Sequence, residues 1–346
     1  MGRWLLCVFA VVAMARPGFC ADEKRASAKE MLEASKQKEF PERPWDKAFE
    51  YNSKHYHVVT NTSRALAQYV GYFMDAVHRS FCDFFGYDET APLANIYVYA
   101  TEKEFKEVAR KHGMPDWTSG FFSYTGERES AIYLPWKPDE RKTPQHILLH
   151  EGTHQFIWLT QRFPIPAGCK AAFGPNVTEL QVVPLWLNEG FATFLEEAEF
   201  DGKDLVTGQV SRSRLSNLKQ LMKTDRLISF EDLFRVTHDD WGEDHYAPSW
   251  GVAYWFLQDK NLEVRKKRKA VLIKYLKTCR KGFFADPDKE FAAKFVTDGA
   301  APKDFWKQWE AHCVKAGFDA FRKMTVGSSG TFEKWQEEWR IWVTGL

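Results

Sequence analysis

The pattern of apolar and polar residues changes along the chain, from short strand-like runs in the first half to helical periodicity in the second. Between residues 51 and 136, short runs of β-branched and aromatic residues predict strands, and longer runs with apolar residues every third or fourth position predict helices. The predicted strands are 55–60, 94–100 and 131–135, and the helices between them are 63–85 and 102–112. After residue 190 the predicted elements are helices at 210–223, 230–236, 248–260 and 265–280, and around 303–315 and 331–343. The pattern therefore predicts an α+β protein with a mixed N-terminal half and a mainly helical C-terminal half.

One apolar stretch of the first half contains a HExxH motif, which reads HEGTH from His150 to His154. The surrounding apolar residues predict a largely buried helix that begins at Pro144, with Thr143 as its N-cap. Two histidines four positions apart lie on one helix face and can bind the same metal ion. Glu151 lies on nearly the same side, where it can take a proton from a water molecule at that metal. The alternative is a surface helix in which these side chains do not form a metal site.

A third metal ligand is expected at Glu189, which lies in the apolar segment from Val183 to Glu196. Pro184 opens this segment, and its apolar residues recur at helical spacing. A lone carboxylate would be costly there, whereas zinc accepts two imidazoles and one carboxylate and keeps one position open. The alternative is a glutamate paired with an arginine or capping a neighbouring helix. Glu196 and Glu197 are expected to support the site from outside or to be solvated.

The two motifs together resemble those of the gluzincin metallopeptidases, and the segment from Trp186 to Ala192 (WLNEGFA) resembles the aminopeptidase N signature. Two departures limit that resemblance. The 34 residues between His154 and Glu189 exceed the usual spacing, so an insertion is expected around 162–179. The Gly-x-Met-Glu-Asn stretch that binds a free amino terminus in aminopeptidase N relatives is absent from the sequence.

From about Tyr51 to the C-terminus, the layout is similar to the peptidase MA-like domains of secreted bacterial proteins. The resemblance implies a zincin-like fold, zinc as cofactor, a peptide or protein substrate, and an active-site cleft between the two halves. In gluzincins, a strand shortly before the metal-binding helix forms a sheet edge along which the substrate lies. Residues 130–134 are similarly placed, as that edge or as an ordinary internal strand.

The resembling families also place a tyrosine beyond the Asn-Glu-Gly helix, where it stabilises the oxyanion of the tetrahedral intermediate. Tyr246 leads a segment similar to theirs and is the candidate for this role. His245 and Tyr254 are the alternatives. An acidic surface loop carrying an ordinary aromatic residue is the plainer interpretation of the same segment.

The first 21 residues are typical of a signal peptide. Arg3 supplies the basic start, residues 4–15 form a short apolar run, and small residues precede a cut near Cys20 or Ala21. The run is too short to span a bilayer comfortably. We therefore predict an exported protein, secreted or periplasmic, with no membrane span. Residues 22–50, which are rich in charge, are predicted to form a tether or an exposed helix.

Four cysteines, Cys82, Cys169, Cys279 and Cys313, remain after the predicted cleavage. In an exported chain they can form two disulfides, and the pair Cys279–Cys313 is expected first. Buried thiols are the alternative.

Composition and charge agree with a folded enzyme. The 346 residues are 44% hydrophobic and 16% aromatic, which allows one large or two modest domains. We divide the mature chain into an N-terminal part, 51–183, and a helical part, 184–346. The formal charge of +1 gives no electrostatic reason to expect nucleic acid or an anionic membrane as a partner.

These observations predict a zinc-dependent hydrolase that cleaves peptide bonds, with His150, His154 and Glu189 as metal ligands and Glu151 as general base. One alternative is another amide or ester hydrolase on the same metal. A second is a secreted binding module with a structural or vestigial zinc site. Glu151 argues against a purely structural site, which has no use for an unligated acid beside the metal.

Overall fold

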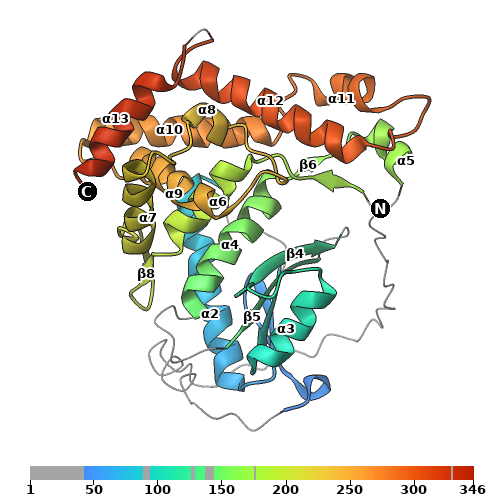
Figure 1. Cartoon of the computed structure of the whole chain (residues 1–346). Coiled ribbons are helices and arrows are strands. Elements are labelled where there is room, and N and C mark those ends of the chain that lie inside the picture. The colour runs from blue at the N-terminus through green and yellow to red at the C-terminus, as the bar shows by residue number, and fades with distance from the viewer. Residues whose placement is uncertain (1–42, 89–93, 126–128, 137–143, 175–176, 329) are drawn as a thin grey trace.

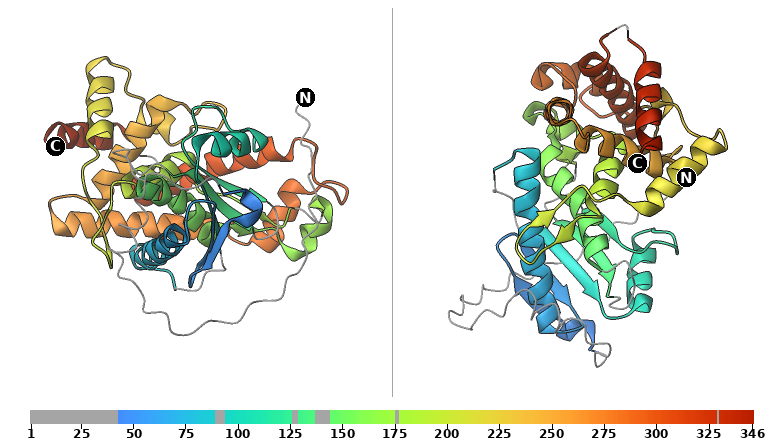
Figure 2. Two further views of the ribbon diagram at one scale, coloured as in Figure 1. Left: turned by 90° about the horizontal axis from the view of Figure 1, so that it is seen from below. Right: turned by 90° about the vertical axis from the view of Figure 1, so that its left-hand side faces the viewer.

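The computed structural model describes residues 43–88, 94–125, 129–136, 144–174, 177–328 and 330–346. The predicted signal peptide, most of the predicted tether and the N-cap at Thr143 lie outside these residues. The α+β prediction is confirmed, because a five-stranded sheet with its helices forms the N-terminal half and a group of helices forms most of the C-terminal half (Figure 1). The helical half sits on one end of the N-terminal half (Figure 2).

The main sheet has the strand order β1-β2-β3-β5-β4. Its strands are β1 (Phe49–Asn52), β2 (Tyr56–Thr60), β3 (Ala94–Tyr99), β4 (Phe121–Thr125) and β5 (Glu129–Pro135), after a short 3-10 helix η1 (Trp45–Lys47). The central strands β2, β3 and β5 are parallel, and the edge strands β1 and β4 are antiparallel to their neighbours. The three predicted strands are therefore present. β1 begins inside the segment predicted as a tether, because it adds to the sheet through pairing with β2.

The strand that the resemblance placed at the substrate edge is internal. β5 pairs with β3 on one side and with β4 on the other, so of the two alternatives for residues 130–134 the internal strand is confirmed and the edge placement is wrong. The edge strand on that side is β4, a segment without a clear strand pattern. β4 is antiparallel to β5 and ends the sheet.

Helices cover both faces of the sheet. α2 (Arg64–Phe85), capped by Ser63, and α4 (Pro144–Gln161) lie on one face, where Ile96, Val98 and Ile132 are fully buried. α3 (Glu102–Lys111) lies on the other face, and its Phe105 packs on Phe121. Successive strand residues face opposite layers, which is why alternate positions of β3 and β5 belong to different cores.

The expected insertion after α4 is a folded segment. It contains β6 (Phe163–Pro164), the 3-10 helix η2 (Ala167–Cys169), α5 (Lys170–Phe173) and β7 (Glu179–Leu180), and β6 pairs with β7. An ion pair of 2.8 Å between Arg162 and Glu179 links the two ends of the insertion. Phe163 is buried and stacks on Trp309 of the C-terminal half, with ring centroids 5.6 Å apart. The insertion therefore packs on the C-terminal helices.

The C-terminal half begins with α6 (Leu185–Leu195) and a small hairpin of β8 (Glu199–Phe200) and β9 (Leu205–Val206). The helices that follow are α7 (Arg212–Lys223), α8 (Phe230–Leu233), α9 (Glu243–Leu257), α10 (Leu262–Cys279), α11 (Pro287–Phe295), α12 (Phe305–Thr325) and α13 (Glu333–Thr344). The predicted helices are present, and α5 and α11 are additional. The predicted start of the helix 248–260 is wrong, because Pro248 lies inside α9. The helix begins at Glu243, where the ring of His245 accepts a hydrogen bond from the backbone N–H of Gly242 at 3.0 Å.

The four cysteines of the described chain are free thiols, so the expected Cys279–Cys313 disulfide is not formed. Burial raises the pKa of both thiols, which keeps them protonated. Among the residues that the structure describes, no helix is both long enough and apolar enough to cross a membrane.

Candidate metal centre

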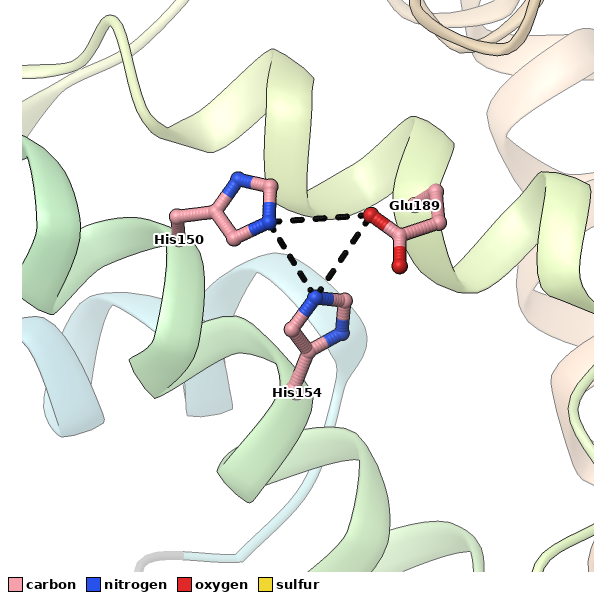
Figure 3. Close-up of side chains that lie close together, drawn as sticks. All are labelled: His150, His154 and Glu189. Carbon is pink, nitrogen blue, oxygen red and sulfur yellow. Dashed lines mark hydrogen bonds and ion pairs between the residues drawn. The ribbon is translucent and has the colours of Figure 1, made fainter. Parts of the chain in front are cut away.

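Three side chains from two helices converge on one point (Figure 3). α4 supplies His150 and His154 from successive turns of one face, and α6 supplies Glu189. The two Nε2 atoms lie 3.2 Å apart, and each lies 3.6 Å from Oε2 of Glu189. The predicted ligands are therefore brought together, with their donor atoms facing one another.

This triangle of donor atoms fits a tetrahedral ion. Ligand atoms held about 2.0–2.2 Å from a tetrahedral centre lie about 3.3–3.6 Å from one another, which agrees with the separations found. Oε2 of Glu189 is buried and accepts no hydrogen bond from any described residue. A buried carboxylate oxygen without a donor is costly, and a cation bound between the three side chains would remove that cost. These residues can hold a metal ion.

Each histidine is oriented by a hydrogen bond at its other ring nitrogen. Nδ1 of His150 lies 2.8 Å from Oε2 of Glu196, and Nδ1 of His154 lies 3.1 Å from Oδ1 of Asn188. Both partners are oxygen acceptors, so each Nδ1 carries a proton and donates, and with a metal bound each Nε2 would present its lone pair to that ion. The partners come from α6 and its C-terminal cap, so one helix supplies a ligand and orients the other two.

Negative charge is concentrated around His150. Burial would lower the pKa of His150, but the hydrogen bond that its ring donates to Glu196 and the charges of Glu151 and Glu189 raise it to about 9. Burial opposes ionisation of Glu196 as well, yet its contacts with His150 and Arg214 lower its pKa to about 2. The surplus of carboxylates over fixed cations is the electrostatic condition that favours a divalent cation at this point.

A second group, His146, Glu196 and Glu197, also gathers three potential ligand atoms. Its carboxylates are already engaged. Glu196 binds the Arg214 guanidinium at 3.2 Å, and Glu197 accepts a 2.5 Å hydrogen bond from Ser211. We therefore interpret this group as the support of His150, in agreement with the role expected for Glu196.

Glu151 lies between the metal-binding face of α4 and the start of the edge strand. A Cβ atom at Gly120 would lie 3.7 Å from Cγ of Glu151 and only 2.3 Å from Cγ2 of Ile147. The absence of a side chain at Gly120 therefore lets the backbone that leads into β4 pass directly over α4. This close approach puts Glu151 next to the start of β4, the edge strand of the sheet.

Tyr246 lies close to the same group of charges. Burial raises the pKa of its hydroxyl, and the nearby carboxylates of Glu189 and Glu151 raise it further. The Arg214 guanidinium lies 5.3 Å from the centre of its ring. The tyrosine is carried by α9, which packs against α6 at Gly190, where a Cβ would lie 2.8 Å from the carbonyl oxygen of Ser249.

The two alternatives to Tyr246 are engaged elsewhere. The ring of His245 caps α9 and stacks on Trp241, with centroids 5.2 Å apart. The hydroxyl of Tyr254 donates a 3.0 Å hydrogen bond to the carbonyl of Gly208. Tyr246, in contrast, has the carboxylates of Glu189 and Glu151 near its hydroxyl.

Two residues of the site were not predicted from the sequence. Asn188 stood inside the recognised motif, but its contact with His154 depends on how α4 and α6 cross. Arg214 has no local signal, because it reaches Glu196 from α7.

The comparisons with known proteins do not identify an activity for this site. A family model described as "Protein of unknown function (DUF1570)" matches residues 171–279. The matched stretch runs from α5 to the end of α10 and includes Glu189 and Tyr246, but not the HExxH helix. No curated protein matches the chain.

Proposed function

We propose that this protein is a zinc-dependent hydrolase of the gluzincin type that cleaves peptide bonds, and that it acts after export from the cell. The observation that carries the proposal is the buried Oε2 of Glu189, which faces two histidine Nε2 atoms and accepts no hydrogen bond from the residues that the structure describes. Two imidazoles and one carboxylate are a donor set that suits zinc and leaves a position open for chemistry. When bound, zinc would supply Lewis-acid polarisation of a substrate carbonyl and acidify a water molecule.

Glu151 is the proposed general base. Its carboxylate does not belong to the ligand triangle, although its charge acts on both His150 and Tyr246. A carboxylate in this position can take a proton from the attacking water and deliver it to the leaving amine nitrogen. A structural metal site would have no use for this acid, which favours the hydrolase over a binding module with structural zinc.

The edge strand β4 is the proposed platform for the substrate backbone. It ends the sheet, runs beside α4, and starts where Gly120 approaches Glu151. An extended peptide that pairs with this edge would have its backbone hydrogen bonds satisfied as it passes the general base. This platform favours a peptide over a small ester as the substrate.

Tyr246 is the proposed oxyanion donor, opposite Glu151. Tyr246→Phe is expected to lower kcat by about a hundredfold to a thousandfold, because one donor to the developing negative charge is lost, while KM changes little. Steady-state kinetics on a cleaved peptide measure both constants, with zinc content as the check on the site. Tyr254→Phe is the matched control and is expected to keep turnover. An unchanged kcat in Tyr246→Phe would remove this residue from the mechanism.

The proposal as a whole is tested with the purified protein from residue 22 onward and a peptide library, with and without a chelator. Cleavage that stops on chelation and returns with zinc is the expected result. Acetylating the amino terminus of the peptides is expected to leave cleavage intact, since the chain lacks the Gly-x-Met-Glu-Asn stretch. Loss of cleavage on acetylation would restore an aminopeptidase. No cleavage of any peptide by zinc-loaded protein would favour the binding module.

A further inference from the structure

A cavity of about 340 Å³ lies next to the metal centre, at the far end of the edge strand. Asn188, which orients His154, is part of its wall, so the cavity and the ligand triangle share a residue. Tyr124 of β4 and Trp158 of α4 also line the cavity, with ring centroids 3.7 Å apart. The cavity therefore continues the path along which a peptide on β4 would lie.

The interior of this cavity is apolar and rich in aromatic rings. Besides Tyr124 and Trp158, its walls include Phe234, Trp309 and Val314. Nε1 of Trp309 already donates to the carbonyl of Gln181 at 3.2 Å, so this indole offers the cavity no unpaired donor.

The charged groups of the cavity wall are paired with one another or with neighbours. Glu179 binds Arg162 at 2.8 Å, and Glu310 binds His238 at 2.9 Å. A charged ligand group would have to compete with these ion pairs. An aromatic group, in contrast, would gain contacts with the rings of the wall and would bury its apolar surface away from water.

We propose that this cavity is a specificity pocket for a large apolar, aromatic side chain of the substrate, on the amino-terminal side of the bond that is cleaved. The inference rests on the proposed peptide hydrolysis. The volume of the cavity falls in the range of about 300–1,000 Å³ that is typical of ligand pockets, and the cavity is large enough for an aromatic ring.

The position of that side chain follows from the geometry of α4 and β4. Ile147 and Glu151 lie beside Gly120, and Trp158 lies beside Tyr124, so helix and strand run in the same direction. A peptide in the stronger, antiparallel pairing would enter at the Tyr124 end and leave at the Gly120 end. Trp158 is four residues beyond His154, which is about 6 Å along the helix and about two residues of an extended peptide. The pocket residue therefore lies about two positions before the scissile bond.

Val314→Trp tests the pocket by filling it. Val314 is half-buried on α12 and is outside the proposed catalytic group. For peptides with tryptophan or phenylalanine at the pocket position, kcat/KM is expected to fall about tenfold to a hundredfold, because the ring can no longer be buried. Peptides with alanine there are expected to be cleaved as by wild type. Ile341→Trp adds the same indole at an exposed position on α13 and serves as the matched control.

A binding measurement separates this inference from the proposed activity. Calorimetry with zinc-loaded Glu151→Gln protein compares an acetylated pentapeptide that contains tryptophan with its alanine counterpart. Preference for tryptophan, lost in the double variant with Val314→Trp, would support the pocket even if no peptide were ever cleaved, in which case only the peptidase proposal fails. Cleavage without any aromatic preference, or an equal loss for all peptides in Val314→Trp, would overturn the pocket and leave the peptidase intact.

Discussion

Glu151→Gln is expected to lower kcat/KM for peptide hydrolysis by about a hundredfold to ten-thousandfold, while the protein keeps its fold and its zinc. The amide has nearly the shape of the carboxylate but cannot take a proton from water. Because Glu151 is not among the converging ligand atoms, its replacement leaves the donor triangle of His150, His154 and Glu189 intact.

Turnover of a library-derived peptide and elemental analysis on the same sample measure the two halves of this expectation. Glu199→Gln makes the same chemical change on the exposed strand β8 and is expected to keep wild-type turnover. Undiminished hydrolysis by Glu151→Gln would move the proton transfer to another residue. Loss of zinc together with turnover would show instead that Glu151 helps to hold the metal.

His150→Ala is expected to remove most of the zinc and with it all measurable hydrolysis. The variant loses one of three ligands and the hydrogen bond between His150 and Glu196, while the carboxylates of Glu151 and Glu189 stay close together. Two remaining ligands hold zinc poorly, and metal binding contributes to the stability of the folded state. Added zinc is therefore expected to raise the thermal unfolding temperature of wild type and to have little effect on that of the variant.

The matched control for this variant is His146→Ala. His146 lies one turn earlier on the same helix and contacts Glu196 and Glu197, but it is not part of the ligand triangle. It is expected to keep a full equivalent of zinc by elemental analysis. Full zinc in His150→Ala, or complete loss in His146→Ala, would mean that the ion is held by the second group of side chains and that the site is assigned to the wrong residues.

The sequence predicts best those elements whose signals are local. α2 and α3 begin beside Ser63 and Thr101, each of which caps its helix through the side chain, and their periodicity is strong. β4 was missed because Phe121–Thr125 reads as a short mixed run, and only pairing with β5 makes it a strand. The helix predicted from residue 248 begins earlier, and Pro248 lies inside it, although a proline is more common in the first turn of a helix than in its interior.

The same distinction applies to the candidate site. His150 and His154 are related by one helical turn, so their common face follows from spacing alone. Glu189 required a second motif, and its distance from the histidines depends on the crossing of α4 and α6. The contacts of Asn188 and Arg214 join residues that are far apart in sequence. The spacing of residues along the chain does not predict such contacts.

The close packing at Gly190 limits how far the molecule can be divided. Glu189 is positioned by α6, α6 lies directly against α9, and α9 in turn packs on α7, α10 and α13 near the end of the chain. The halves named from the sequence are thus not independent modules. A fragment that stops before α9 would still contain every ligand and the general base, yet it would lack the support that holds the third ligand opposite the first two.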